Sequence, residues 1–139
     1  MSNFPYYRFR CEMLAGQVIW PTESLILVAW SGPLEFFPED VTVGDITTRA
    51  HSVLRGVSLP ITGAAIHSHG YAQSDPALIQ GITIGATITY FTMARKMGTT
   101  ASSQLLLYID EAWDLPWTAN GLDLPVQPDW LAMEGWFRP

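Results

Sequence analysis

Gln104-Leu105-Leu106-Leu107-Tyr108-Ile109 is the clearest strand pattern in the sequence. Successive side chains of a strand point to opposite faces, so this run is apolar on both faces of any sheet that contains it. A strand with two apolar faces indicates a sheet that is covered on both sides. Strict alternation places its apolar residues on two sides, with Leu105, Leu107 and Ile109 on one and Leu106 and Tyr108 on the other.

Downstream of this run, Asn120-Gly121 predicts a tight turn, because both residue types tolerate positive φ. We expect Leu122 to Val126 to return beside residues 104–109 and to form a hairpin with them. Asp110 lies where the strand ends, so its carboxylate can accept hydrogen bonds from backbone N–H groups of the loop. None of these groups is arranged for catalysis.

Short runs of strand-forming residues separated by turn residues also fill the upstream sequence. The clearest are Leu25 to Trp30 and Ala86 to Met93. A helical turn is expected at Val41 to Arg49, capped by Asp40 or Thr42, and another at Asp75 to Leu78. About seven or eight short strands at this spacing predict an all-β fold, an antiparallel sandwich or barrel. Weaker strands are expected at Val53 to Leu59, Ala64 to His67, Gln80 to Ile84, Leu122 to Val126 and Gly135 to Arg138.

The 139 residues suffice for one domain, which we place at residues 25–139. Residues 1–24 differ, because aromatic patches such as Phe4-Pro5-Tyr6-Tyr7 and Ile19-Trp20-Pro21 recur there without a clear period. This composition predicts an extended N-terminal arm, which packs either on its own domain or on a neighbouring subunit. The N-terminus has no apolar signal region and no run approaches a membrane span, so we expect synthesis in a cytoplasm.

Composition limits the possible functions. Hydrophobic residues make up 48% and charged residues 14% of the chain, against about 25% charged in typical domains. This excludes disorder as the main state and predicts that other subunits cover much of the surface. The net charge of −6, with six acids and no base between Lys96 and Arg138, opposes general nucleic-acid binding. The single cysteine, Cys11, excludes an intramolecular disulfide.

Side chains that could carry chemistry are few. The carboxylates of Glu39-Asp40 and Asp110-Glu111 are adjacent in sequence, so on an extended chain they point apart. His67 and His69 would share one side of a strand and, with His51, could form a three-histidine metal site. We favour a polar loop at these histidines, since no Asp, Glu or Cys lies nearby in sequence to complete a ligand shell. We therefore predict no catalytic, cofactor or metal site.

The segment from Ser103 to Val126, with its Tyr-Ile-Asp strand end and Asn-Gly-x-Asp turn, resembles a segment of small structural proteins of tailed bacteriophages. Upstream, Phe36 to Ile46 and Ala86 to Met93 are similar to earlier stretches of that group. The resemblance spans about Val41 to Arg138. The arm before Ser24 has no counterpart in the group, and Asp114 and Trp117 replace small residues.

This resemblance implies a non-enzymatic virion protein, most simply a decoration or cement protein on the capsid surface. Its implied partners are the major capsid protein and copies of itself, for which a trimer is one arrangement, with no nucleic acid, membrane or cofactor. A position in the neck, tail or fibre base is the nearest alternative. The predicted partner-interface residues are Phe4, Tyr6, Tyr7, Arg8, Phe9, Trp20, Trp113 and Trp117.

Two other classes of protein remain as alternatives. A carbohydrate-binding module is suggested by six tryptophans in a small β-domain, with Trp113, Trp117 and Trp130 as stacking platforms. A metal-dependent enzyme would use His51, His67 and His69. For the tryptophans, packing in the core or against a subunit is the simpler interpretation.

Overall fold

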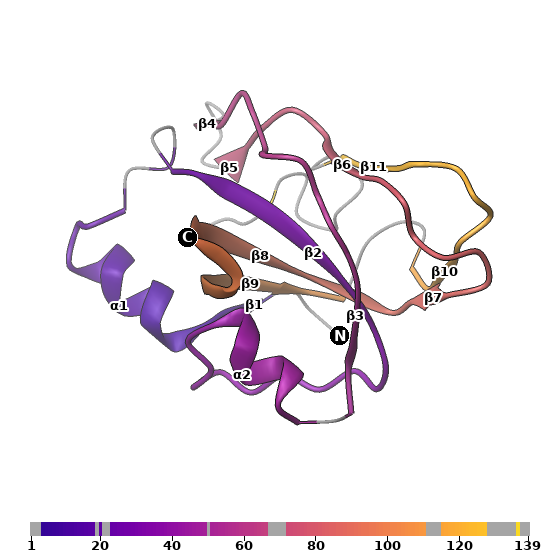
Figure 1. The fold of residues 1–139 in the computed structure, drawn as a ribbon. Coiled ribbons are helices and arrows are strands. Elements are labelled where there is room, and N and C mark those ends of the chain that lie inside the picture. The colour runs from indigo at the N-terminus through magenta and orange to yellow at the C-terminus, as the bar shows by residue number, and fades with distance from the viewer. Residues whose placement is uncertain are drawn as a thin grey trace.

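The computed structural model describes residues 4–18, 20, 23–49, 51–66, 72–110, 115–127 and 136. Their largest element is a five-stranded antiparallel sheet with the order β1-β9-β8-β2-β3 (Figure 1). The longest strands, β8 and β9, form a hairpin through Gly98, which has a positive φ of 63°. The strands of this sheet are β1 (Phe4–Pro5), β2 (Leu25–Ser31), β3 (Val53–Val57), β8 (Tyr90–Met97) and β9 (Thr99–Ile109).

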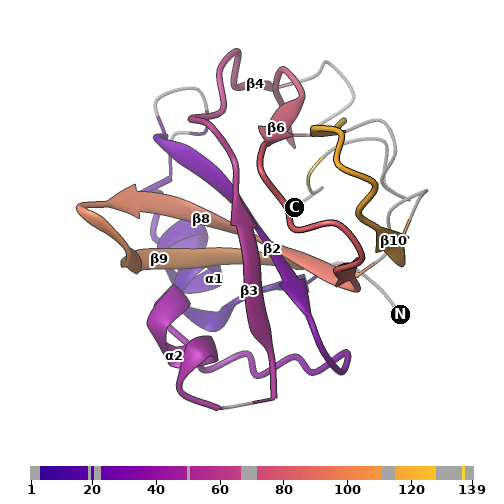
Figure 2. The same ribbon diagram turned by 45° about the vertical axis from the view of Figure 1, so that its right-hand side comes forward.

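Three small antiparallel pairs and two helices complete the described fold. In Figure 2 the small pairs lie on one side of the large sheet. Helix α2 (Val43–Thr47) packs on the opposite face, and helix α1 (Tyr7–Leu14) lies beside β9 and buries Phe9 in the same cluster as the small pairs. The predicted all-β antiparallel fold is confirmed and is sandwich-like. The pairs are β4 (Ala65–Ile66) with β5 (Ala72–Gln73), β6 (Ala77–Ile79) with β11 (Leu124–Val126), and β7 (Thr87–Ile88) with β10 (Trp117–Thr118).

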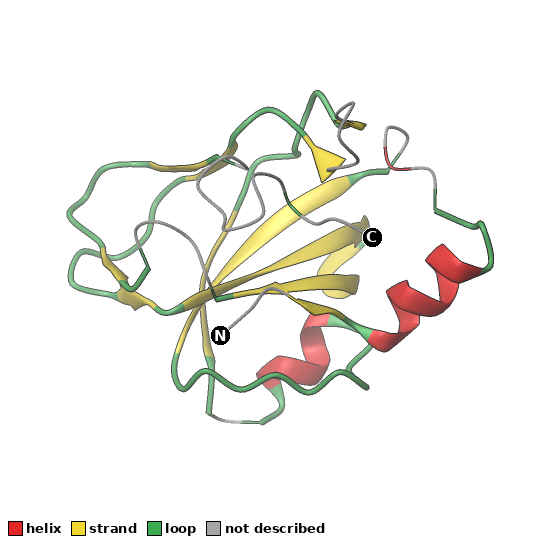
Figure 3. Ribbon diagram, turned by 180° about the vertical axis from the view of Figure 1, so that it is seen from behind, coloured by secondary structure: helices red, strands yellow, loops and turns green. Residues whose placement is uncertain are grey.

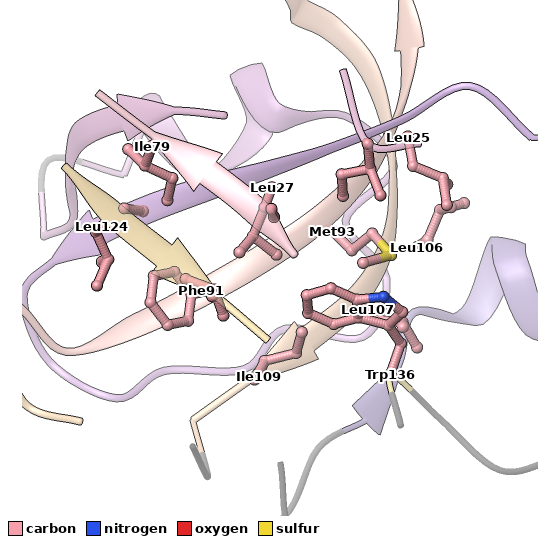
Figure 4. Packing of buried hydrophobic residues seen from close by; sticks show 14 of the residues in the cluster. Leu25, Leu27, Ile79, Phe91, Met93, Leu106, Leu107, Ile109, Leu124 and Trp136 are labelled. Atoms are coloured by element: carbon pink, nitrogen blue, oxygen red, sulfur yellow. The ribbon is translucent and has the colours of Figure 1, made fainter. Parts of the chain in front are cut away.

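Both faces of the large sheet are buried, as the apolar pattern predicts. Side chains between the sheet and the small pairs form the main core cluster (Figure 4). A second cluster fills the space between the sheet and α2. Strand β2 contributes to both, because Leu25, Leu27 and Ala29 face the main cluster, whereas Ile26, Val28 and Trp30 face the second.

A β-bulge changes the predicted facing of residues 105–109. Leu107 pairs with Met93 and Leu105 pairs with Ala94, so Leu106 is an extra residue in β9. An extra residue interrupts the alternation of side chains along a strand. Leu105 therefore shares the second cluster with Tyr108, while Leu106, Leu107 and Ile109 enter the main cluster. The predicted division of these residues is wrong for this reason.

The predicted hairpin between residues 104–109 and 122–126 is also wrong. Strand β11 pairs with β6, because β8 and β1 occupy the two edges of β9 at this end. Residues 80–84 form a loop instead of a strand, and Ala77–Ile79 is a strand where we expected a helical turn. The expected strand at Gly135 to Arg138 lies almost entirely outside the described residues. The helix within 41–49 is confirmed as α2, with a capping box between Thr42 and Asp45.

The N-terminal segment is not an extended arm throughout. Among its described residues, only Phe4–Pro5 is a strand, which pairs with Tyr108 and Leu107 of β9, and the backbone N–H of Tyr6 donates to the Leu106 carbonyl at 2.9 Å. Residues 7–14 form helix α1, although isolated helices this short are unstable in water. Tertiary packing supplies the missing stability, because Phe9 is completely buried in the main cluster. The segment thus packs on its own domain.

Candidate interaction surface

Helix α1 has an inner face and an outer face. Phe9 is fully buried, and Glu12 and Met13 are partly buried, so these three residues form the face toward the sheet. Residues three and four positions apart share one side of a helix. Tyr7, Arg10, Cys11 and Leu14 therefore point away from the sheet, and all four are exposed. We call these four residues the outer α1 face.

An ion-pair network fixes α1 against the sheet. The guanidinium of Arg95 on β8 donates to both carboxylate oxygens of Glu23, at 2.7 and 3.1 Å, and to Glu12 on α1 at 2.9 Å. The side-chain amide of Gln104 on β9 donates to the other oxygen of Glu12 at 2.6 Å. Burial alone would raise the pKa of Glu12, but these hydrogen bonds and the guanidinium charge outweigh it and lower the pKa. The charged form of Glu12 thus holds the helix in place.

Replacing Arg95 with methionine should lower the free energy of unfolding by about 1–2 kcal/mol near neutral pH, because Glu12 and Glu23 lose their cation in a partly buried site. Urea denaturation measures this change. Arg55→Met is the matched control, since Arg55 is exposed and only its Nε donates to Ser31, at 3.0 Å. We expect the control to change the stability by less than about 0.5 kcal/mol.

The sign of the pH dependence follows from the lowered pKa of Glu12. Its contribution to stability is complete above the unfolded-state pKa, about 4.3, and is lost as the pH falls through the lower folded-state value. Glu12→Gln should therefore lose less stability than the wild type between about pH 5 and pH 2. An identical acid dependence in the two proteins would contradict the ion pair.

The outer α1 face exposes large apolar side chains next to positive charge. Leu14 is 89% exposed and Tyr7 is 53% exposed. The guanidinium carbon of Arg10 lies 6.0 Å from the centre of the Tyr7 ring, within range of a cation–π interaction. Arg8 is also exposed on this helix. The helix thus presents an apolar and basic surface on an acidic chain.

A second exposed apolar site lies at the opposite end of the molecule, where the loops next to β7 and β10 meet (Figures 1 and 3). Ile84 is 73% exposed and Leu122 is 70% exposed. The side chain of Ile84 lies close over Gly121, where a Cβ would be 3.3 Å from its Cδ1. Asp123 is exposed beside them and accepts a long hydrogen bond of 3.4 Å from Gln80. We call Ile84, Leu122 and Asp123 the loop tip.

The predicted interface residues fall into two groups. Tyr6, Phe9 and Trp20 are buried in the domain's own core, so the prediction that they contact another subunit is wrong. Tyr6 reaches the core from the N-cap of α1, Phe9 from α1 itself, and Trp20 from a separate segment. Exposed or half-buried positions are Phe4, Tyr7, Arg8 and Trp117, and Trp113 lies outside the described residues.

Two of these residues have partners that limit their role. Phe4 stacks on Phe36 with ring centres 5.3 Å apart and leaves one edge exposed. Trp117 is half-buried and packs against the main core cluster. A flat, fully open indole for sugar stacking is therefore not available at Trp117. Trp113 and Trp130, the other predicted sugar platforms, lie outside the described residues.

A row of buried and partly buried aromatic rings crosses the second cluster, and the local sequence pattern does not predict it. Trp30 stacks on Tyr90, and Tyr90 packs against Tyr108 with ring centres 5.1 Å apart. Phe36 contacts both Tyr108 and Tyr6. Trp30, Tyr90 and Tyr108 come from β2, β8 and β9, which are adjacent in the sheet, so cross-strand neighbours on one face account for these three rings. Tyr6 joins them from the N-cap of α1, and Phe36 joins them from the loop before α2.

The hydroxyl groups of this row remain protonated at neutral pH. Burial raises the pKa of Tyr6, and burial together with the nearby Asp110 carboxylate raises that of Tyr108. Burial also raises the pKa of Asp40, although its ion pair with Arg49 opposes the shift. A tyrosine with a raised pKa is a poor nucleophile and a poor base, so this cluster is suited to packing.

Of the three histidines in the predicted metal site, only His51 lies within the described residues. His51 is exposed, with its Nδ1 atom 3.3 Å from a carboxylate oxygen of Glu35. His67 and His69 lie outside the described residues. Within the described ranges, no three His, Cys, Asp or Glu side chains gather as a metal site would require. No helix in the same ranges has both the length and the hydrophobicity to cross a membrane.

The chain matches no protein-family model, no curated protein and no solved structure.

Proposed function

We propose that the chain is a non-enzymatic structural protein of a tailed-bacteriophage virion, in the role of a decoration or cement protein on the capsid. The resemblance of residues 103–126 to small structural proteins of such phages supports this assignment. In this role the protein, made in the host cytoplasm, binds the assembled shell and stabilises it by contacts between subunits.

The observation that carries the proposal is the pair of exposed apolar sites on a domain with few charges. Leu14 is 89% exposed and Leu122 is 70% exposed, at two ends of the fold, while only 14% of the residues are charged. Burying one such side chain contributes about 1.5–3 kcal/mol. A few anchors on each copy, repeated over a shell, add up to a large stabilisation against the pressure of packaged DNA.

The contact mechanism differs from the one that the sequence suggested. An N-terminal arm lying on a neighbouring subunit is no longer part of the proposal, because Tyr6 and Phe9 are core residues of their own domain. The contacts are instead assigned to preformed surfaces, namely the outer α1 face and the loop tip. Preformed surfaces lose less conformational entropy on binding than a flexible arm does.

Copy number in purified particles tests the proposal and separates it from its nearest alternative. A decoration protein should be present at a fixed ratio of the order of one copy per capsid subunit, whereas a neck ring holds about a dozen copies. Quantitative mass spectrometry against the major capsid protein measures this ratio. A ratio in the neck range would move the protein to the neck or tail, and absence from the particles would contradict a virion role.

A further inference from the structure

We propose that copies of this chain join head to tail, with the outer α1 face of one copy against the loop tip of the next. The proposal deepens the assembly role above, on which it rests for its biological setting, by naming a second copy as the occupant of these two surfaces. Three observations support it: the apolar residues at each site, their opposite charges and their positions at opposite ends.

Each site exposes two large apolar side chains that the chain's own fold leaves uncovered. On the outer α1 face these are Tyr7 and Leu14, and on the loop tip they are Ile84 and Leu122. Single exposed apolar residues are common on monomers, but paired ones on rigid supports are typical of interaction sites. Here α1 is fixed by Phe9 and the Arg95 network, and Ile84 lies closely over Gly121.

The charges of the two sites favour contact between unlike ends. The outer α1 face carries the exposed Arg10, whereas the loop tip carries the exposed Asp123. The one carboxylate of the helix, Glu12, binds Arg95 at 2.9 Å and lies 3.5 Å from Arg8, so Arg10 carries the positive charge of the outer α1 face. Two α1 faces, or two loop tips, would bring like charges together. Contact of an α1 face with a loop tip pairs opposite charges, which favours the head-to-tail orientation and speeds association.

The positions of the sites determine the kind of assembly. The two sites lie at opposite ends of the molecule in the front and rear views (Figures 1 and 3). An end-to-end contact through one site therefore leaves the other site of each copy free for a further copy. A contact between unlike surfaces is heterologous, and its repetition gives a closed ring or an open chain. The expected products thus include species larger than a dimer.

Cys11 lies on the outer α1 face and makes the contact directly testable by thiol cross-linking. In the variant Leu122→Cys, a short bis-maleimide should join Cys11 of one copy to residue 122 of the next. The two positions are at opposite ends, so the linker cannot join them within one copy. Denaturing gel electrophoresis should then show dimers, trimers and higher products in a regular series.

Matched controls distinguish this series from random collisions. The wild type, with Cys11 alone, and the double variant Cys11→Ser/Leu122→Cys should give at most traces of dimer. Met97→Cys adds an exposed thiol at the β8–β9 hairpin, away from the loop tip, and should give no series. A series with Met97→Cys equal to that with Leu122→Cys, or no series with Leu122→Cys, would overturn the proposal. Efficient dimerisation of the wild type would instead indicate contact between two α1 faces.

Charge reversal gives a second, independent measurement in the Leu122→Cys background. Arg10→Glu and Asp123→Arg should each reduce the cross-linked yield about two- to fivefold, as expected for one exposed ion pair. Their combination should restore the yield, whereas a structural defect would make the effects add. This experiment uses purified protein and needs no capsid. If the protein decorates shells but never cross-links, the head-to-tail contact is overturned and the proposed function stands. The capsid protein would then be the occupant of the outer α1 face.

Discussion

Phe9→Ala should lower the free energy of unfolding of the isolated chain by about 3–5 kcal/mol, the usual cost of removing a buried aromatic side chain. Phe9 is completely buried and connects α1 to the main core cluster. Loss of its ring leaves a cavity between the helix and the sheet. Because a helix of eight residues has little stability of its own, α1 should also fray from the domain. Urea denaturation followed by tryptophan fluorescence measures the change.

Tyr7→Ala is the matched control for this prediction, because it removes an aromatic ring from the same helix at an exposed position. We expect it to change stability by less than about 1 kcal/mol. The two substitutions have similar effects on helix propensity, so their difference reports burial. If Phe9→Ala were as mild as Tyr7→Ala, the N-terminal segment would not be docked on its own domain. That result would favour the alternative in which the N-terminal segment packs on a neighbouring subunit.

Trp136→Ala should have an effect of similar size, about 3–5 kcal/mol, because this indole is completely buried among Leu107, Ile109 and their neighbours (Figure 4). Its position is fixed by two hydrogen bonds. The backbone N–H of Trp136 donates to the Ala72 carbonyl at 2.8 Å, and the indole N–H donates to the Ser74 hydroxyl at 2.7 Å. Trp136 is therefore predicted to close the main core cluster.

Trp136→Phe separates the packing of the ring from its hydrogen bond. It keeps most of the apolar volume and loses the indole N–H, so we expect a smaller loss of about 1–2 kcal/mol. Ser74→Ala removes the same hydrogen bond from the other side and should cost about 1 kcal/mol. Thermal unfolding of the three variants ranks them by their loss of stability. Near-wild-type stability of Trp136→Ala would show that this tryptophan does not belong to the core in solution.

Local pattern predicted two of the three clearest strands, whereas the third, Ala86 to Met93, is divided at Thr89 between β7 and β8, which belong to different sheets. The segments 25–30 and 104–109 are strands, and α2 begins at the capping box that Thr42 and Asp45 form. The pairing between strands could not be predicted from local patterns. The bulge at Leu106 and the pairing of β11 with β6 depend on contacts between distant segments, which no local spacing encodes.

The candidate surface was predicted in part. Tyr7 and Arg8 are exposed as expected, but their neighbours Tyr6 and Phe9 are core residues. Apolar positions at 6, 9 and 13 repeat at helical spacing, and this signal could have identified α1 and its inner face. Leu14 then falls on the outer face. The loop tip had no comparable signal, since Ile84 and Leu122 meet only in the folded chain.

An image reconstruction of purified phage particles tests the proposed decoration role most directly. A decoration protein should contribute one domain-sized density at every equivalent position on the outer surface of the shell, with α1 faces and loop tips at the joints between densities. Such a map would also show whether the α1 face meets another copy or the capsid protein. A shell without these densities, with the domain found at a single vertex or in the tail, would contradict the decoration role.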